Sequence, residues 1–240
     1  MITSTTMQQT RRTKLHHNAN QAILVLECPW ILDEQDSNRS SVLPFVEGIA
    51  KMAGGTDVFH ANFYDKNSFI KALSILCSVR FENAIIYIAA HGNEKHIGNV
   101  KLNDIFSKIG EYSKKSNITG LMLGSCFTGA NMASPQSTLQ GTNLYWCCGY
   151  SSSSEWLSGV MIDCSIISEM INTENISKNN QNDFIELFSK ALAPFSPKYI
   201  IGEDSKKNPV TLDESIRVVT QPSGQGLRAK EITKNIFKKN

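Results

Sequence analysis

Two apolar runs joined by one amphipathic stretch constrain this fold more than any other feature of the sequence. Residues 84–90 read Ala-Ile-Ile-Tyr-Ile-Ala-Ala and run into His91, and residues 120–124 read Gly-Leu-Met-Leu-Gly, two positions before Cys126. Between the two runs, apolar residues recur at helical spacing over residues 102–112. Strand, helix, strand in that order is a crossover unit, which places both strand ends on one edge of a parallel sheet. Ligands bind outside the carboxyl ends of such strands, so His91 and Cys126 are expected where ligands bind.

The rest of the chain continues this alternation of strands and helices. Continuous apolar runs predict four more strands, and apolar residues at helical spacing predict four more helices. The strands are expected at residues 22–27, 57–64, 144–150 and 198–202, and the helices at residues 41–53, 69–77, 157–171 and 184–192. The sequence therefore predicts an α/β domain with a mostly parallel, six-stranded sheet.

Composition divides the chain into three segments. Residues 1–20 lack Asp and Glu and are expected to form a disordered arm, in preference to a transit peptide. Residues 21–204 are expected to form the folded domain. Residues 205–240 carry eight Lys or Arg against three acids, and they are expected to form a basic, solvated extension. Nucleic-acid binding by this tail is a disfavoured alternative, which salt-sensitive binding would reveal. Residues 130–141 and 172–182 are expected to be exposed loops.

The overall composition narrows the class of protein. A formal net charge of +2 over 240 residues does not favour nucleic acid or a membrane surface as a partner of the whole chain. No apolar run approaches the roughly 18 residues of a membrane-spanning helix. The six cysteines are scattered without a C-x-x-C pair, so neither zinc nor thioredoxin-like chemistry is indicated. With no secretory signal at the N-terminus, a cytoplasmic protein with reduced thiols is expected.

A cysteine and a histidine at neighbouring strand ends can support nucleophilic catalysis by a thiol. A thiolate attacks a carbonyl well only when another group lowers its pKa or accepts its proton, and histidine is the usual partner. Gly124 and Ser125 leave room beside Cys126 for a substrate. Gly92 allows the backbone to approach the reacting carbonyl, where its N–H can donate to the developing oxyanion. These residue types together indicate acyl transfer.

Residues 87–92 read Tyr-Ile-Ala-Ala-His-Gly and residues 123–129 read Leu-Gly-Ser-Cys-Phe-Thr-Gly. Both segments resemble the two catalytic motifs of caspase-like cysteine peptidases. The closest likeness is to the bacterial CHAT branch, which typically reads Phe-Ala-x-His-Gly and then Ser-Ala-Cys-x-Thr-Gly. The likeness covers residues 22–202 by strand order, and the two motifs are its specific part. It implies a caspase–hemoglobinase fold, which is a three-layer α/β/α sandwich, and endopeptidase activity.

The same resemblance implies a role for each motif residue. Cys126 would be the nucleophile, His91 the general base, and the backbone N–H groups of Gly92 and Cys126 the oxyanion donors. The resemblance implies no metal or organic cofactor. Such bacterial domains act as switched effectors in stress or phage defence, so the expected partners are a protein or peptide substrate and a separate regulatory protein, with no membrane. Affinity capture from the native host would test for that regulator.

Substrate preference does not follow from the resemblance. Metacaspases carry an Asp two positions before the nucleophile, where it helps to bind a basic side chain, and this chain has Gly124 there. In CHAT proteins, pocket residues follow the fifth strand, which makes Ser151, Ser153 and Glu155 pocket candidates together with Ser125. Glu155 is also placed to be an acid at the start of the next helix, and we favour that interpretation.

Several alternatives stay open on the sequence alone. Cys126 is also consistent with a small buried residue at a strand end, which would leave a catalytically inactive, caspase-like binding module. His96 is a rival base, and His60 is expected to be structural. Cys147 and Cys148 are adjacent on one strand and are expected to point to opposite faces of the sheet. A flavodoxin-like nucleotide binder is disfavoured because no glycine-rich loop follows the first strand.

Overall fold

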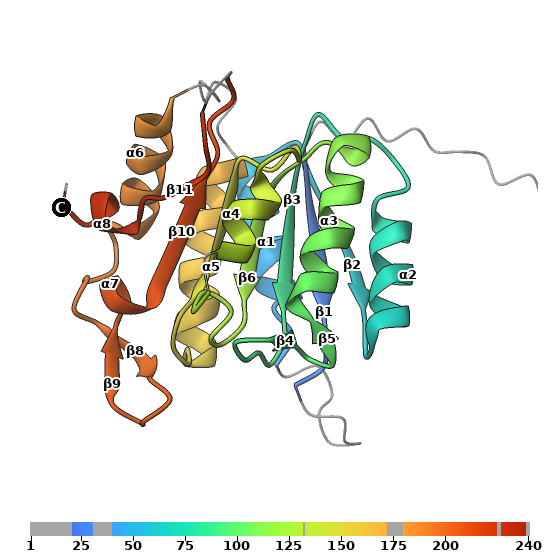
Figure 1. Cartoon of the computed structure of the whole chain (residues 1–240). Helices are drawn as coiled ribbons and strands as arrows, with labels where there is room; N and C mark the ends of the chain where they lie inside the picture. Colours follow the sequence, from blue (N-terminus) through green and yellow to red (C-terminus); the bar gives the residue numbers. More distant parts are fainter. Residues whose placement is uncertain (1–20, 31–39, 132, 172–179, 225–226, 239–240) are drawn as a thin grey trace, which may run out of the picture.

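A computed structural model describes residues 21–30, 40–131, 133–171, 180–224 and 227–238 of the chain. Within these residues a seven-stranded sheet lies between two layers of helices (Figure 1). The strands, in order across the sheet, are β11 (Lys230–Glu231), β10 (Ile216–Thr220), β7 (Trp146–Tyr150), β6 (Ile118–Gly124), β3 (Asn83–Ala89), β1 (Gln21–Glu27) and β2 (Thr56–Asn62). The five strands from β7 to β2 are parallel, whereas β10 and β11 run antiparallel to their neighbours.

The helices pack on both faces of the sheet. One face is covered by α1 (Leu43–Ala53), α5 (Trp156–Ile171), α6 (Gln181–Leu192) and α8 (Thr233–Ile236), and the other by α2 (Lys66–Leu76), α3 (Leu102–Ser116) and α4 (Ala133–Leu139). The arrangement is the three-layer α/β/α sandwich that the family resemblance implies. None of the helices in the described residues is long and apolar enough to cross a bilayer.

Two small hairpins lie at the carboxyl end of the parallel strands (Figure 1). They are β4 (His96–Ile97) with β5 (Val100–Lys101), and β8 (Ile200–Glu203) with β9 (Pro209–Thr211), which is followed by the short helix α7 (Leu212–Ser215). Both hairpins therefore border the edge of the sheet at which the sequence places His91 and Cys126.

The alternating side chains of the central strands explain the two-sided core. In β1, Leu24 and Leu26 enter the cluster beneath α2 and α3, whereas Ile23 and Val25 enter the cluster beneath α1 and α5. All four side chains are fully buried. A strand covered on both faces needs apolar residues at every position, which is the pattern that the sequence shows.

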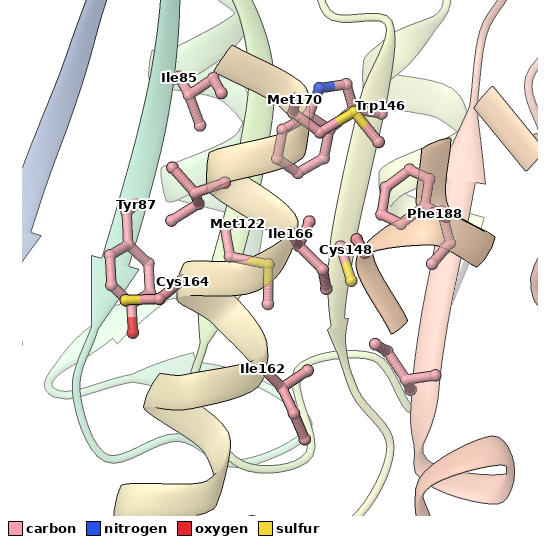
Figure 2. Close-up of a cluster of buried hydrophobic side chains, with 14 of the residues drawn as sticks. Ile85, Tyr87, Met122, Trp146, Cys148, Ile162, Cys164, Ile166, Met170 and Phe188 are labelled. Carbon is pink, nitrogen blue, oxygen red and sulfur yellow. The ribbon is translucent and has the colours of Figure 1, made fainter. Parts of the chain in front are cut away.

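Among the long helices, α5 buries the largest share of its residues. Its residues Ile162, Ile166 and Met170 pack on side chains of β3, β6 and β7, among them Tyr87 and Met122 (Figure 2). Nine of its sixteen residues are buried, so this helix tolerates little polarity on the side that faces the sheet.

The C-terminal part of the sheet differs from the sequence-based expectation. The sheet has seven strands, not six, and residues 198–202 do not join it, because β8 pairs with β9 in a separate hairpin. The segment 205–240, expected as a basic extension, supplies β10, β11 and α8. These elements are too short for periodicity to reveal, and their register depends on contacts with β7.

One of the two segments expected as exposed loops contains a helix. Residues 130–141 contain the short helix α4, which buries Pro135 and Leu139 and was hidden by its polar composition. The expected N-terminal arm, residues 1–20, and residues 172–179 of the asparagine-rich loop lie outside the described residues.

Candidate active site

The pairing register of β3 and β6 places His91 and Cys126 at the same height along the sheet. Strands β3 and β6 are parallel, and Ala89 of β3 is paired with Gly124 of β6. His91 and Cys126 each follow their paired residue by two positions (91 − 89 and 126 − 124). Because neighbouring strands lie about 4.8 Å apart, both residues leave the sheet side by side and at one level.

Gly92 brings the backbone of the histidine motif against the cysteine motif. A methyl group built on Gly92 would lie 2.7 Å from the backbone oxygen of Cys126 and 2.8 Å from Cβ of Ser125. Real Cβ contacts are essentially never this short, so a side chain at position 92 would force the two strand ends apart. Glycine is therefore required here for close approach of the backbones.

The backbone N–H of Gly92 is left out of the hairpin that follows it. Gly92 forms an isolated bridge with Ile97, and the two hydrogen bonds beside that bridge run from Gly98 N–H to the carbonyl of His91 and from Asn93 N–H to the carbonyl of His96, at 2.7 and 2.9 Å. In this pattern the N–H of the bridged residue points away from its partner strand. Its donor is thus not used within this hairpin.

The histidines occupy distinct environments. His91 is exposed, and its ring packs edge-on against Trp30 with the ring centroids 4.3 Å apart. His96 is half-buried in β4. His60 lies on β2 and pairs with Glu27, with His60 Nε2 3.1 Å from Glu27 Oε2, which agrees with its predicted structural role. Among these three histidines, His91 alone lies just beyond the carboxyl end of a parallel strand, next to the strand that leads to Cys126.

The backbone around Cys126 is held in an unusual turn. Phe127 has a φ of 60°, in the left-handed region that side-chain-bearing residues rarely adopt. Its N–H donates to the carbonyl of Ser152 at 2.9 Å, which ties this turn to the segment after β7. From the same segment, the N–H of Ser154 donates to Cys126 Sγ at 3.4 Å. Strained turns of this kind concentrate at functional sites.

Cys126 differs from the other cysteines in its exposure. All six cysteines lie in the described residues, and Cys126 is the one that is not buried. Burial raises the pKa of Cys77 to about 11 and that of Cys164 to about 12, and it raises the pKa values of Cys28, Cys147 and Cys148 as well. A thiol with a raised pKa and no solvent access is inert. Cys147 and Cys148 enter opposite core clusters, as predicted.

A small cavity lies directly beside Cys126. Its lining residues are Trp30, Val42, Tyr87, Gly124, Ser125, Cys126, Tyr150, Ser154, Trp156, Gly159, Val160 and Asp163. Three of them, Trp30, Ser125 and Trp156, carry a buried polar atom that has no hydrogen-bond partner among the described residues. Buried polar atoms are normally satisfied, so three unpartnered ones around a single cavity suggest a place for a polar ligand.

A buried carboxyl group forms the inner end of this cavity. Asp163 of α5 is only 1% exposed, and its two carboxyl oxygens accept hydrogen bonds from Tyr87 at 2.8 Å and Tyr150 at 2.6 Å. Burial raises the pKa of Asp163 to about 7, although both hydroxyl groups act to lower it. Burial likewise raises the pKa values of both tyrosines well above their usual range, next to the Asp163 charge.

The structure places the four pocket residues predicted from the sequence in different surroundings. Ser125 lines the cavity beside Cys126. Ser151 Oγ donates to the carbonyl of Ser215, and Ser153 Oγ donates to the carbonyl of Glu203, so both serines hold the C-terminal segment. Ser153 also lines a second cavity, together with Phe127 and Glu203. Glu155 is exposed, directly precedes α5 and does not line the cavity. Glu155 lies one position before the helix and not in its first turn, and its carboxylate accepts a hydrogen bond from the hydroxyl of Ser158.

Sequence reasoning missed Asp163. Its signal was present, because Asp163 is an acidic residue on the face of α5 that also carries Val160, Ile166 and Ile167, all buried. An acid flanked at helical spacing by apolar residues is expected to be buried. A buried acid needs hydrogen-bond or ionic partners, or it belongs to a functional site. Trp30 lies at the edge of a polar segment and gave no comparable signal.

Comparison with known proteins supports the fold. No protein-family model matches the chain, and no curated protein sequence is significantly similar to it. The structure is similar to that of caspase-1 from Spodoptera frugiperda, with a TM-score of 0.51 and 9% sequence identity over 85% of this chain and 87% of that chain. It is also similar to a secreted cysteine protease from Bacteroides thetaiotaomicron (TM-score 0.49, 9% identity, 84% and 66% of the two chains) and to the Drosophila initiator caspase Dronc (0.45, 13%, 75% and 75%). At these identities the likeness to the insect caspase-1 shows a caspase-like fold and nothing finer.

Proposed function

We propose that this protein is a cysteine endopeptidase in which Cys126 is the nucleophile and His91 the general base. The observation that carries the proposal is the strand register, since Ala89 and Gly124 are paired and each motif residue follows by two positions. The contact of Gly92 with the Cys126 carbonyl supports it. The finer placement in the CHAT branch, and a role as a regulated bacterial effector, rest on the motif resemblance alone.

The proposed reaction proceeds through an acyl-enzyme. His91 accepts the proton of the Cys126 thiol, and the thiolate attacks the carbonyl carbon of the peptide bond. The N–H groups of Gly92 and Cys126 donate to the resulting oxyanion. The protonated His91 then gives its proton to the departing amine as the C–N bond breaks, which leaves a thioester on Cys126. His91 next deprotonates a water molecule, whose attack on the thioester releases the acid and regenerates the thiol.

Labelling with a thiol-directed, peptide-based acyloxymethyl ketone tests the dyad. We expect the wild-type protein to be labelled and Cys126→Ala to be unlabelled. His91→Ala should be labelled much more slowly than the wild type and should cleave peptides about 10²–10⁴-fold more slowly. His96→Ala is the matched control and should react like the wild type. Labelling that persists unchanged in both Cys126→Ala and His91→Ala would rule out the dyad.

Cleavage of peptides distinguishes an active peptidase from the alternative, a catalytically inactive binding module. A peptide-library digest with the wild-type protein should yield cleavage products that are absent with Cys126→Ala. Peptide binding by the wild type without any cleavage under all conditions would favour the binding module.

A further inference from the structure

The histidine motif meets an indole ring at the carboxyl end of the sheet. The ring of Trp30 packs edge-on against the ring of His91, with the two ring centroids 4.3 Å apart and the ring planes at 76° to each other. Edge-to-face contacts between aromatic rings are attractive and directional, because the edge of one ring is positive and the face of the other is negative. The contact therefore favours one orientation of the imidazole over the others.

Strand pairing explains why Trp30 reaches His91. Strand β1 pairs with β3 at an offset of 62 residues (89 − 27), and the N–H of Cys28 continues this pairing by donating to the carbonyl of Ala89 at 3.1 Å. At the same offset, position 29 is level with His91. Pro29 has no N–H with which to extend the ladder, so the pairing ends there and Trp30 follows beside the histidine.

His91 lacks a polar partner that could orient its ring. The imidazole forms no hydrogen bond or ion pair with any of the residues that the structure describes, and His91 is exposed. Exposed side chains change rotamer within nanoseconds. A general base has to stay within hydrogen-bond reach of the thiol, and a third group commonly orients it there. Within the described part of the chain, the indole of Trp30 is in position to take this role.

Trp30 is itself restricted on its inner side. It lines the small cavity beside Cys126, together with Trp156 and Val160, and its Nε1 is shielded from solvent. The free volume of this cavity is about 10 Å³, far less than an indole ring occupies. The ring of Trp30 thus has no room to turn inward, away from His91.

We infer that Trp30 is a positioning residue of the proposed peptidase, and that its indole holds the His91 imidazole in the orientation in which it can accept the Cys126 proton. The inference rests on the proposed function and adds a third side chain to the dyad. Trp30 exchanges no proton itself, and it acts through His91.

Steady-state cleavage of the best peptide from the library digest tests the inference. We expect Trp30→Leu to lower kcat about 10–100-fold and to leave KM nearly unchanged, because a misplaced base slows the chemical step and does not weaken substrate binding. Trp30→Phe keeps an aromatic ring and should recover most of kcat. Phe45→Leu is the matched control. It removes another edge-on contact, that of Phe45 with Trp156 at 5.8 Å and 75°, and should keep the wild-type kcat.

The outcomes separate this inference from the proposed function. A raised KM with an unchanged kcat in Trp30→Leu would make Trp30 a residue that binds substrate, and would overturn the positioning role. Equal losses of kcat in Trp30→Leu and Phe45→Leu, or no loss in either, would overturn it as well. A wild-type protein that cleaves no peptide would instead contradict the proposed function.

Nuclear magnetic resonance of the wild-type protein covers the case in which Trp30→Leu does not fold. With ¹³C-labelled histidine, the ring protons of His91 can be assigned by comparison with His91→Gln. We expect them to show nuclear Overhauser effects to the side chain of Trp30 and a shift caused by the ring current of the indole. Absence of both signals would overturn the inference even in an active peptidase.

Discussion

Asp163 places an ionisable group in a part of the molecule where its neighbours are apolar. Helix α5 buries Val160, Ile162 and Ile166 around it, and Asp163 itself is only 1% exposed. Two tyrosine hydroxyls stabilise the charged form, but burial outweighs them and raises the pKa of Asp163 to about 7. The residue is therefore partly protonated at neutral pH.

The raised pKa of Asp163 predicts a pH-dependent stability. The folded state holds a proton on Asp163 that the unfolded chain, with the ordinary pKa of 3.8, has already released at pH 5. The stability that this proton confers is complete below about pH 4 and is lost as the pH rises through about 7. The folded protein should thus lose about 4 kcal/mol of unfolding free energy from this group between these limits.

Urea unfolding of the wild type and Asp163→Asn at about pH 5 and pH 8 measures this effect. Asparagine resembles the protonated acid, so the variant should show a smaller difference between the two pH values than the wild type. An equal pH dependence in both proteins would show that Asp163 titrates at its ordinary pKa in the fold.

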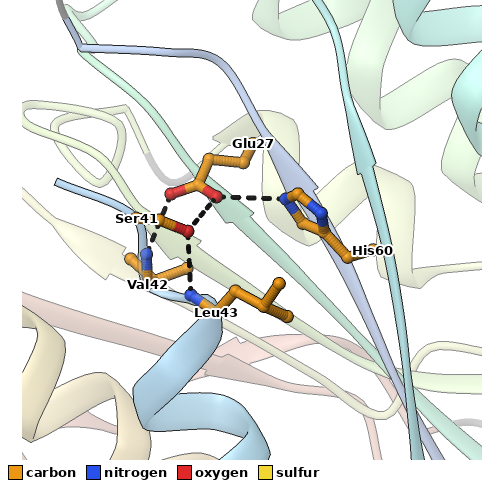
Figure 3. A network of polar contacts seen from close by, with 5 residues as sticks. All are labelled: Glu27, Ser41, Val42, Leu43 and His60. Atoms are coloured by element: carbon orange, nitrogen blue, oxygen red, sulfur yellow. Dashed lines mark hydrogen bonds and ion pairs between the residues drawn. The ribbon is translucent and has the colours of Figure 1, made fainter. Parts of the chain in front are cut away.

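At the scale of elements, a buried carboxylate joins three elements beside the sheet edge. Glu27, the last residue of β1, accepts hydrogen bonds from the N–H of Val42 at 2.9 Å and the hydroxyl of Ser41 at 2.8 Å, and it pairs with His60 of β2 (Figure 3). The N-cap residue of α1, Val42, has no side chain that could cap the helix, although the hydroxyl of Ser41 accepts a hydrogen bond from the N–H of Leu43 at 3.2 Å. Glu27 therefore satisfies a free N–H at the start of α1 from a distant strand, with a charge that suits the helix dipole.

Glu27→Gln should lower the unfolding free energy by about 1–3 kcal/mol, because it removes the charge from hydrogen bonds that are shielded from water. The midpoint of urea unfolding measures the change. His60→Gln is the milder comparison, since the His60 side chain is 25% exposed and loses one contact, and it should cost less than about 1 kcal/mol. An effect of His60→Gln equal to or larger than that of Glu27→Gln would contradict the role of Glu27 as the helix cap.

At the scale of the whole molecule, the C-terminal segment completes the sheet. Strand β10 pairs with β7 over five residues, and its Ile216, Val218 and Val219 are fully buried. Ser151 and Ser153, which follow β7, are hydrogen-bonded to residues 215 and 203. The chain beyond residue 204 thus supports the segment that also contacts Cys126 through Ser154.

Truncation after residue 204 should therefore abolish cooperative unfolding, because it exposes β7 and removes apolar core residues that contribute about 1.5–3 kcal/mol each. Thermal melting followed by circular dichroism tests this. The double variant Lys234→Gln, Lys238→Gln removes basic charge from exposed positions and should melt like the full-length protein. A truncated chain that still melts cooperatively would show that residues 205–240 are a dispensable extension.

The sequence by itself determined the two motifs and the alternation of strands and helices over most of residues 22–192. Continuous apolar runs can be accommodated only as strands covered on both faces, and the amphipathic stretch between 90 and 120 can only cross over one face of the sheet. These local patterns were sufficient to predict a mostly parallel sheet and the edge at which His91 and Cys126 lie, whereas the three-layer sandwich was implied by the motif resemblance. They were insufficient for β10 and β11, which are short and gain their stability from pairing with β7 and with each other.

Only the tertiary structure decided the register between β3 and β6. Ala84 is paired with Ile118, an offset of 34 residues (118 − 84), but Ile85 is paired with Gly120, an offset of 35 (120 − 85). The extra residue is Thr119, whose hydroxyl donates to the side-chain carbonyl of Asn83. This irregularity shifts all later pairs by one position.

The shift places Cys126 level with His91, since the two residues are also 35 apart (126 − 91). With the earlier offset of 34, His91 would be level with Ser125, and Cys126 would point to the other face of the sheet. Such a register depends on contacts between segments that are distant in the sequence. The position of Asp163 of α5 next to Gly124 depends on such contacts as well. Local patterns carry no information about either, because both arise from packing between residues about 35–40 positions apart in the chain.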